Sequence, residues 1–447
     1  MPLSQIAEVV GATDVFGAAH CHGVSTDTRT LSAGNIYVGL NGPNFKGSQF
    51  ADAACKAGAA AAVLDKRSDA ALPQIVVDDP LLALTRLASA WRAQSQTTVI
   101  GITGSNGKTT MRSLVAAAVG NVPTLATQGN LNNHIGVPLT LLRLSAAHRF
   151  AVIEMGANHR HEIATLADIA KPAIGIVTNA GPAHLEGFGS LQGVAEGKGE
   201  LFESLGGAGV AVINRDDDFY SYWCERAKPA RCLSFGQHVE ADIRCVAVQR
   251  VTPVAFTLAY AGAQYSVELQ LSGMHNALNA CGAIACGIAA GVELDELIDR
   301  IATVTPEPGR QRELTSALGG VLIDDSYNAN PASMRAAAMA LAAAHPHAWM
   351  VIGDMGELGE DAQALHASLG PAFREAGIER LFTLGPLSAG TAETFGDGAN
   401  RFDSVECLID ALASELTADV AVLVKGSRSM RMERVVDALV TAKEVLH

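Results

Sequence analysis

One stretch restricts the fold of this 447-residue chain more than any other, because it joins an apolar strand to a glycine-rich loop. It reads Thr98-Val-Ile-Gly-Ile-Thr-Gly-Ser-Asn-Gly-Lys-Thr-Thr110 and runs into a helix-like segment, 111–119. Strand, glycine loop and helix, in this order, are typical of a phosphate-binding loop. Glycines let backbone N–H groups turn toward phosphate oxygens, and the helix N-terminus adds partial positive charge. The sequence therefore predicts a nucleotide-phosphate site.

The residues of this loop have distinct expected roles. We expect Lys108 to reach the β- and γ-phosphates and the Thr109 hydroxyl to hold Mg²⁺. The strict motif has glycine at position 102, whereas this chain has Ile102, with Gly101 one residue earlier. An ordinary strand-to-helix turn is the alternative, but Gly-Lys-Thr-Thr directly after an apolar strand favours the nucleotide site. The residues predicted to hold the ATP phosphates are Gly104, Ser105, Asn106, Gly107, Lys108, Thr109 and Thr110.

Composition limits the partners of the chain. Its net charge of −14 argues against general binding of nucleic acids or membrane surfaces. None of the eight cysteines forms a Cys-x-x-Cys pair, and the first residues lack the basic and apolar regions of a secretory signal. No apolar run reaches the ~20 residues that a membrane span needs. We therefore expect a soluble, cytoplasmic protein with reduced thiols, and a monomer.

Strands and helices alternate in three α/β units, predicted at 1–96, 97–308 and 309–447. This alternation is typical of mostly parallel, doubly wound sheets. The central unit also has an antiparallel appendage between 242 and 271, and two prolines and a glycine mark 305–310 as a linker. We expect strands at 36–40, 59–64 and 75–77, then 99–103, 150–155, 174–179 and 210–214, then 320–325, 349–353, 380–384 and 420–425.

Polar residues follow the central strands, at the edge where parallel sheets bind ligands. Glu154 ends one strand, and a carboxylate suits Mg²⁺, although a surface glutamate is the alternative. His184 lies in the loop after another strand, and Lys198 lies among acids in Glu196-Gly-Lys-Gly-Glu200. Taken alone, His184 and Lys198 are more typical of structural or solvated side chains. A functional role for either residue therefore has to be inferred from the side chains around it.

Two asparagines lie three residues apart near the start of a small-residue helix. Asn276 and Asn279 fall on one helix face, and their amides offer the donor and acceptor that an adenine edge requires. Capping of the helix by Asn276 is an equally good explanation. Three functional classes remain open at this point: an ATP-dependent ligase or kinase, a nucleotide-switched binding protein, and a motor or transporter ATPase. The enzyme is favoured, because the candidate strand ends in Glu154-Met155-Gly156 and not in the Asp or Asp-Glu that is usual in a motor.

Six motifs are distributed over all three units: 101–110, Thr127-Gln-Gly-Asn-Leu-Asn-Asn-His-Ile-Gly136, His184-Leu-Glu-Gly-Phe-Gly189, Lys198-Gly-Glu200, Gly273-Met-His-Asn-Ala-Leu-Asn279 and Asp324-Asp-Ser-Tyr-Asn-Ala-Asn-Pro331. Together they resemble the motifs of the Mur ligase family. Within the family, three details resemble members that add D-alanyl-D-alanine: Ser326-Tyr-Asn-Ala-Asn-Pro331, Val351-Ile-Gly-Asp-Met-Gly-Glu-Leu-Gly359 and Lys425-Gly-Ser-Arg-Ser-Met-Arg431. The Asp-Asn-Pro-Arg motif of members that add a diamino acid is absent from the sequence.

The resemblance implies a fold and a reaction. The fold would have a small N-terminal α/β domain, a central phosphate-loop domain with a parallel sheet, and a C-terminal Rossmann-like domain. ATP would phosphorylate the terminal carboxylate of UDP-N-acetylmuramoyl-tripeptide, and the amine of D-alanyl-D-alanine would attack the acyl phosphate, in peptidoglycan precursor synthesis. A related ligase adding another amino acid, or a nucleotide-switched binding protein, is the alternative. Both steps bring anions together, so charge neutralisation would carry most of the catalysis.

The resemblance also assigns residues. Lys108, His184 and Lys198 would be catalytic. Thr109 and Glu154 would hold one of two Mg²⁺ ions, and Lys198, carbamylated by CO₂, would join His184 at the second, since an unmodified ammonium cannot coordinate a cation. The nucleotide would also contact Asn276, Asn279, Arg310 and Asp325. The UDP-sugar would lie at Ser25, Thr26, Asp27, Arg29 and Asn41, the muramoyl-peptide at Asn132, Asn133 and His134, and the dipeptide at Tyr327, Asn328, Asn330 and Ser333.

Overall fold

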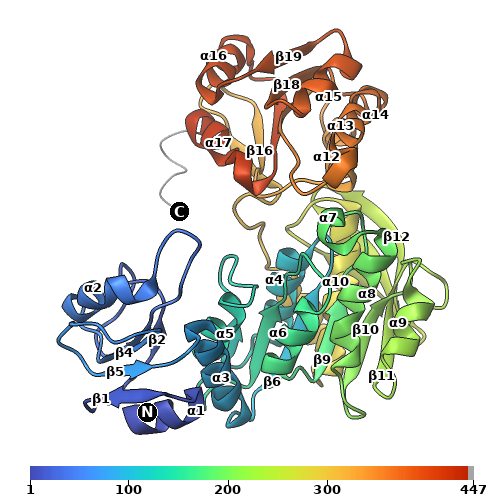
Figure 1. Cartoon of the computed structure of the whole chain (residues 1–447). Helices are drawn as coiled ribbons and strands as arrows, with labels where there is room; N and C mark the ends of the chain where they lie inside the picture. The colour runs from blue at the N-terminus through green and yellow to red at the C-terminus, as the bar shows by residue number, and fades with distance from the viewer. Residues whose placement is uncertain (441–447) are drawn as a thin grey trace.

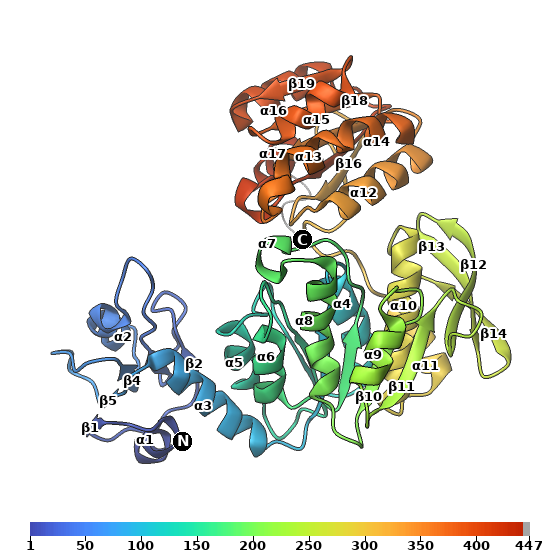
Figure 2. The same ribbon diagram turned by 45° about the vertical axis from the view of Figure 1, so that its right-hand side comes forward.

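The computed structural model describes residues 1–440, and three separate β-sheets divide them into three α/β units. Figures 1 and 2 show the first unit beside the central one and the third above it. The three-domain α/β architecture predicted from the sequence is confirmed. Residues 441–447, at the end of the third predicted domain, lie outside the described residues.

The first unit has a five-stranded sheet in the order β1-β5-β4-β3-β2, in which only the β1–β5 pair is antiparallel. Helix α3 leaves this unit and packs against both α1 and the central helices α5 and α6. Its Trp91 indole donates to the Leu144 carbonyl at 3.0 Å, which ties the first unit to the central one. The elements are α1 Leu3–Val10, β1 Asp14–Phe16, β2 Val24–Ser25, β3 Ile36–Val38, η1 Gly47–Phe50, α2 Ala51–Lys56, β4 Ala61–Leu64, β5 Gln74–Val76 and α3 Pro80–Ala93.

The central unit has a nine-stranded sheet in the order β14-β13-β12-β11-β10-β9-β6-β8-β7. β12 pairs parallel with β11 and antiparallel with β13, so the predicted antiparallel appendage extends the same sheet. The elements are β6 Thr98–Thr103, α4 Lys108–Val119, β7 Thr124–Ala126, α5 Gly136–Leu141, β8 Phe150–Glu154, α6 Glu162–Ala170, β9 Ile174–Val177, α7 Leu185–Phe188, α8 Leu191–Glu203, β10 Val210–Asn214, α9 Tyr220–Arg226, β11 Arg231–Gly236, β12 Ile243–Val251, β13 Val254–Tyr260, β14 Ala263–Glu268, α10 Met274–Ala289 and α11 Leu294–Ile301.

The central strands are buried on both faces, and alternate residues serve different cores. Ile100 and Val152 pack in a core with residues of α4 and α10, whereas Val99 and Ile153 pack in a core with residues of α5 and α6. This is the two-residue period of a strand covered by helices on both sides. Because both faces are apolar, polar residues of these strands are confined to their ends. Hydrophobic burial thereby fixes the edge at which chemistry can occur.

The third unit repeats this plan with a six-stranded sheet, β15-β16-β20-β17-β18-β19, in which β15 alone is antiparallel to its neighbour. Met350 and Ile352 pack in a core with α12 and α14, and Val351 packs in a core with α16 and α17. The elements are β15 Arg312–Thr315, β16 Val321–Asp325, α12 Pro331–Ala344, β17 Ala348–Gly353, η2 Gly359–Asp361, α13 Ala362–Ala367, α14 Leu369–Ala376, β18 Arg380–Leu384, α15 Ser388–Phe395, β19 Ala399–Phe402, α16 Val405–Glu415, β20 Ala421–Lys425, η3 Arg428–Met430 and α17 Glu433–Leu439.

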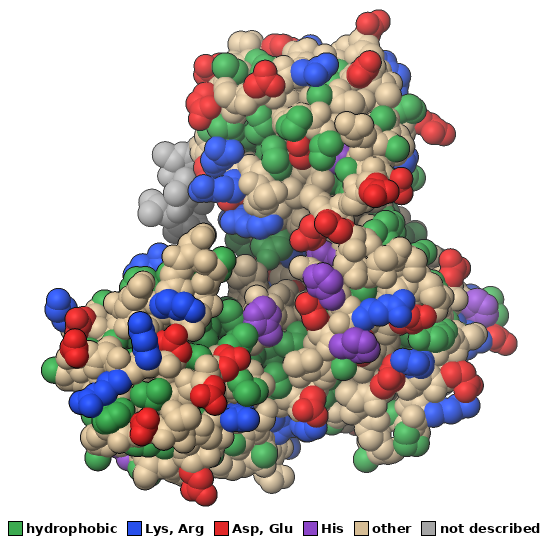
Figure 3. Space-filling model, in the orientation of Figure 1, with side chains coloured by type: hydrophobic (Ala, Val, Ile, Leu, Met, Phe, Trp, Pro, Cys, Tyr) green, Lys and Arg blue, Asp and Glu red, His purple; other side chains and the backbone are tan. Residues whose placement is uncertain are grey.

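The three units face a common hollow. Figure 3 shows it where the lobes meet, with histidine side chains on the central lobe and Lys and Arg side chains along the lower edge of the upper lobe. Within residues 1–440, no helix has the length and apolar character needed to cross a membrane.

The loop after β3 is held by a backbone contact that leaves no room for a side chain. The contribution of this contact to stability can be tested by mutation. A Cβ on Gly47 would lie 2.0 Å from the carbonyl carbon of Gly39. We expect Gly47→Ala to lower the free energy of unfolding by about 1–3 kcal/mol, because the two segments must move apart. Urea denaturation measures this. The control is Gly206→Ala, whose Cβ would meet nothing within 4 Å; equal effects of both variants would contradict the assignment.

Candidate active site

The glycine loop between β6 and α4 is braced by the end of β9. Gly104 has φ 146°, and a Cβ there would lie 1.9 Å from the Thr178 hydroxyl oxygen. Thr178 Oγ1 donates to the Asn106 carbonyl at 2.6 Å, and the Asn106 N–H donates to Asn179 Oδ1 at 3.1 Å. Gly107 has φ 79° and directly precedes α4. The loop therefore has a backbone path that glycine favours, and its shape is fixed by side chains from the neighbouring strand.

Lys108 begins α4 and folds back over the loop. Its ammonium donates to the Gly104 carbonyl at 2.7 Å. Burial lowers the pKa of Lys108, while the negative charge of Glu154 acts in the opposite direction. The cation thus lies against the loop predicted to receive phosphates, next to the N–H groups of a helix N-terminus.

Thr109, at the start of α4, meets Glu154, at the end of β8. Thr109 Oγ1 donates to Glu154 Oε2 at 3.1 Å, and Asn132 Nδ2 donates to Glu154 Oε1 at 2.8 Å. Glu154 is 2% exposed, and Arg112 Nη1 lies 4.0 Å from the same Oε2. A buried hydroxyl and carboxylate suit the preference of Mg²⁺ for oxygen. No group of three or more His, Cys, Asp or Glu suited to a metal occurs within residues 1–440.

Lys198 is buried on α8, with 1% of its surface exposed. Its ammonium donates to the Ala157 carbonyl at 3.2 Å and lies 5.1 Å from the centre of the Phe188 ring. Burial, and then the positive charge of Lys108, lower the pKa of Lys198 well below its ordinary value. The neighbouring Glu200 accepts the N–H groups at the start of α6 and so is occupied. Burial of this kind favours the neutral amine over the ammonium.

His184 is brought to the same place by the loop before α7, with φ 55°. Its Nδ1 contacts a carboxylate oxygen of Glu357, which belongs to the third unit. Burial lowers the pKa of His184, and Lys108 and Lys198 act in the same direction, while Glu357 raises it. The structure therefore places the three predicted catalytic side chains, Lys108, His184 and Lys198, in one electrostatic environment.

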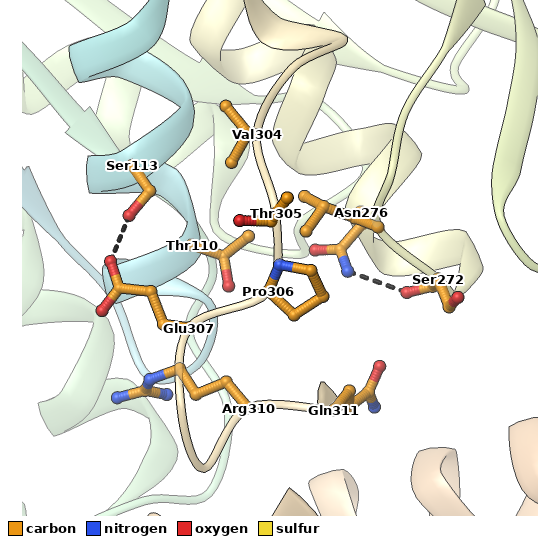
Figure 4. A pocket seen from close by; sticks show the side chains of 11 residues that line it. Thr110, Ser113, Ser272, Asn276, Val304, Thr305, Pro306, Glu307, Arg310 and Gln311 are labelled. Atoms are coloured by element: carbon orange, nitrogen blue, oxygen red, sulfur yellow. Dashed lines mark hydrogen bonds between the residues drawn. The ribbon is translucent and has the colours of Figure 1, made fainter. Parts of the chain in front are cut away.

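A pocket lies between α4, the start of α10 and the linker (Figure 4). Asn276 lines it and donates to the Ser272 carbonyl at 2.8 Å, and Asn279 donates to Asn276 Oδ1 at 3.0 Å. Neither asparagine caps the helix, because Gly273 is the N-cap residue and α10 has no side-chain cap. The lining residues are Thr110, Ser113, Leu271, Ser272, Asn276, Val304, Thr305, Pro306, Glu307, Arg310 and Gln311.

The linker contributes a carboxylate that sequence reasoning missed. Glu307 contacts both Arg112 and Ser113 of α4, and Figure 4 shows the Ser113 contact beside the pocket. Arg112 is in turn near Glu154, so the linker is tied electrostatically to the predicted metal site. Glu307 and Arg112 are 195 positions apart, and the only local signal is the proline on each side of Glu307.

The third unit touches the glycine loop directly. Asn330 Nδ2 donates to Asn106 Oδ1 at 2.7 Å, while Asn330 also caps α12 in a reciprocal capping box with Ser333. Asp325 accepts from Lys425 Nζ at 2.7 Å, and the same ammonium donates to the Asn328 carbonyl at 2.9 Å. This buried pair was not predicted, although both residues end neighbouring strands.

The aromatic ring of Tyr327 lies between two cations. The Arg310 guanidinium carbon is 4.2 Å from the ring centre, and that of Arg428 is 5.7 Å away. Arg310 also lines the pocket between α4 and the start of α10, so the Tyr327 ring connects the linker with the third unit.

The predicted UDP-sugar residues remain within the first unit. Arg29 pairs with Asp27 and lowers the pKa of that carboxyl to about 2. Ser25 Oγ accepts the Asp27 N–H at 3.2 Å, with Thr26 between them. Asn41 donates to Asp65 and accepts from the Gly47 N–H, each at 3.1 Å. These residues lie on a different unit from the glycine loop.

The three residues predicted to face the muramoyl-peptide lie in three different environments. Asn132 is bonded to Glu154 as described above. Asn133 Oδ1 accepts from the N–H groups of Ile135 and Gly136 and so turns the chain into α5. His134 is exposed.

Comparison with known proteins gives the same assignment over the whole length. Three family profiles match in order: "Mur ligase family, catalytic domain" over 20–92, "Mur ligase middle domain" over 102–287 and "Mur ligase, glutamate ligase domain" over 309–428. The UDP-N-acetylmuramoyl-tripeptide–D-alanyl-D-alanine ligase of Escherichia coli is 38% identical over 444 residues, 98% of each chain. The chain therefore belongs to the Mur ligase family, and it is an ATP-dependent ligase.

Comparison with solved structures shows that the similarity extends to the fold. A crystal structure of MurF from Acinetobacter baumannii is 31% identical and covers 97% of both chains, with a TM-score of 0.89. The structure of the MurF ligase from Thermotoga maritima in complex with ADP has a TM-score of 0.82 at 24% identity, over 93% of this chain and 96% of that one. The latter similarity concerns the fold alone.

The tight approach at Gly104 predicts a loss of ATP binding on substitution. In Gly104→Ala the new Cβ would overlap the Thr178 hydroxyl at a φ that L-residues avoid, so the loop must shift. We expect the Kd for ATP with Mg²⁺ to rise about tenfold or more, as measured by isothermal titration calorimetry. Gly390→Ala, with nothing within 4 Å of its Cβ, is the control. An unchanged Kd in Gly104→Ala would refute the assignment of the loop.

Proposed function

We propose that this chain joins D-alanyl-D-alanine to UDP-N-acetylmuramoyl-tripeptide with consumption of ATP, through an acyl-phosphate intermediate, in peptidoglycan precursor synthesis. The observation that carries the proposal is the full-length similarity to enzymes named for this activity, at 38% identity for the Escherichia coli relative. It includes the third unit, which would select the incoming amine. The contact of this unit with the glycine loop through Asn330 and Asn106 supports the same conclusion.

The first step would be transfer of the γ-phosphoryl group. A carboxylate oxygen of the tripeptide attacks phosphorus, the bond to the β-phosphate oxygen breaks, and ADP leaves. Lys108 and the helix N-terminus stabilise the charge that accumulates between the two anions. In the second step the dipeptide nitrogen attacks the acyl carbon, phosphate leaves, and the nitrogen gives up a proton. The chain supplies position and charge, and phosphate is the leaving group that the carboxylate lacks.

Thr109 and Glu154 fit the first Mg²⁺ by the chemistry of their oxygens and by their burial. When bound, such an ion neutralises the phosphate oxygens. For the second ion we propose His184 and a carbamate formed on Lys198. The support is the buried amine with a strongly lowered pKa, because CO₂ reacts with neutral amines and a carbamate provides anionic oxygens.

The remaining assignments follow the three units. We propose that Asn276, Asn279, Arg310 and Asp325 lie around the nucleotide, with support from the pocket lined by Asn276 and Arg310. The first unit would hold the UDP-sugar and the residues at 327–333 the dipeptide. One chain thus carries a complete set of proposed contacts, so we propose that it acts as a monomer. Because the reaction uses ATP, we place it in the cytoplasm.

Substrate dependence of phosphate release tests the function. We expect phosphate release by the purified chain to require ATP, UDP-N-acetylmuramoyl-tripeptide and D-alanyl-D-alanine together, since the acyl phosphate needs both a carboxylate and an amine. A coupled phosphate assay measures it, with single amino acids in place of the dipeptide as controls. Release that needs neither acceptor nor dipeptide would refute the proposal, and a preference for a single amino acid would assign another member of the family.

Carbamylation of Lys198 has a direct test. We expect Lys198→Ala to lower kcat at least 100-fold, because the site loses an anionic ligand, and short carboxylic acids to restore part of the activity. Labelling with ¹³C-bicarbonate provides a second readout, a carbamate carbon signal in the wild-type NMR spectrum that is missing in the variant. Lys171→Ala, at an exposed lysine, is the matched control. Full activity of Lys198→Ala, or no carbamate signal in the wild type, would contradict the proposal.

A further inference from the structure

The turn after β17 presents one carboxylate to the central unit. It spans Asp354–Glu357, and Glu357 contacts His184 across the domain boundary. Glu357 has φ 61°, a backbone conformation that costs a non-glycine residue of the order of 1 kcal/mol or more. Strain of this kind persists only where the surroundings impose it, and it is concentrated at functional sites.

The surroundings do impose it, because the turn is anchored on both sides. Met355 and Leu358 are buried at 1% and 5% exposure, and the Met355 N–H donates to the buried His366 Nε2 at 2.8 Å. The Asp354 carbonyl accepts from the Ser427 N–H at 3.0 Å. Between these anchors, Glu357 projects outward with 55% of its side chain exposed. A rigid turn therefore holds a solvent-accessible carboxylate at the domain boundary.

This carboxylate lies close to the proposed reaction site. His184 follows Gly181, whose N–H donates to Ser105 Oγ of the glycine loop at 2.9 Å. Lys108 and Lys198 both influence the pKa of His184, so the partner of Glu357 is within reach of their charges. The second contact between the units, Asn330 with Asn106, touches the same loop. Glu357 is thus brought by the third unit to a region dominated by positive charge.

The incoming dipeptide presents a problem in such a region. An α-amino group with a pKa near 8 arrives mostly as an ammonium at neutral pH, and Lys108 would repel it. A carboxylate that accepts a hydrogen bond from the ammonium offsets this repulsion and fixes the nitrogen next to the acyl group. The third unit is the part of the chain proposed to bind the dipeptide, so the carboxylate should come from it.

The other carboxylates at these strand ends are already used. Asp324 accepts from the Gly309 N–H and from Ser326, and Asp325 pairs with Lys425. Asp354 accepts the N–H groups of Leu387 and Ser388 at the start of α15. Glu357 instead contacts the imidazole of His184, and its side chain is 55% exposed. Among these carboxylates it is therefore the one that an incoming ligand can approach from solvent.

We propose that Glu357 is a substrate-binding residue that receives the ammonium group of the incoming amine. The inference rests on the proposed ligase function and specifies which residue of the third unit recognises the nucleophile. The chemical class recognised is a primary ammonium next to a D-configured carbon, and the recognition is by charge and hydrogen bonding.

Glu357→Gln tests this, because the amide keeps the shape and can still bond to His184. We expect the KM for D-alanyl-D-alanine to rise about 10- to 100-fold, the usual worth of a hydrogen bond to a charged group, with the KM values for ATP and for the UDP-tripeptide unchanged. The analogue D-lactyl-D-alanine keeps the terminal carboxylate but has a neutral hydroxyl in place of the ammonium, so it should inhibit variant and wild type with equal Ki. Glu360→Gln, in the same exposed segment, is the matched control.

Each outcome is decisive. An unchanged dipeptide KM would overturn the inference, as would an equal rise in all three KM values, which would make Glu357 a domain contact only. An equal rise in the Ki for D-lactyl-D-alanine would overturn it as well. If the wild type shows no phosphate release that depends on the dipeptide, the proposed function fails and the inference fails with it. If the wild type shows that dependence, failure of the variant result concerns Glu357 alone.

Discussion

Burial of the central strands on both faces is the constraint on which the site depends. With Ile100 and Val99 committed to opposite cores, strand β6 can carry polar groups only where it ends. The parallel register then aligns that end with its neighbours, with Ile102 opposite Glu154 and Thr103 opposite Val177. The glycine loop, the Glu154 carboxylate and the Thr178 hydroxyl are therefore gathered by sheet geometry. Hydrophobic packing far from the chemistry sets its position.

The contact between the third unit and the central unit also depends on strands that carry polar residues only at their ends. The third unit also presents the carboxyl ends of parallel strands, and it contacts the central unit there, through Asn330 at Asn106 and Glu357 at His184. The linker adds Glu307 on Arg112, beside Glu154. A movement of the third unit must therefore break or remake these polar contacts with the glycine loop, with His184 and with Arg112.

The sequence predicts those features of the fold and the site that are determined by short stretches of the chain. Each strand range predicted from an apolar run agrees within about two residues with an observed strand, whereas β7, β11, β15 and β19 are not predicted. The Gly-Lys-Thr run predicts a phosphate loop despite Ile102. The sequence does not predict pairs such as Arg112–Glu307, Asp325–Lys425 or His184–Glu357, in which the partners are separated by 100 residues or more. Nothing in a carboxylate's own neighbourhood in sequence says which distant cation it meets. Tertiary structure alone makes that choice.

Lys198 illustrates why those distant partners matter for chemistry. Among acidic neighbours in sequence, it resembles an ordinary solvated lysine. In the fold it is 1% exposed, its amine faces the Ala157 carbonyl and the Phe188 ring, and Glu200 is occupied by the N-terminus of α6. A cation in that position is costly, since burial and Lys108 both oppose it. The fold therefore favours loss of the charge, and conversion to a carbamate would turn the least stable cation of the site into an anion beside His184.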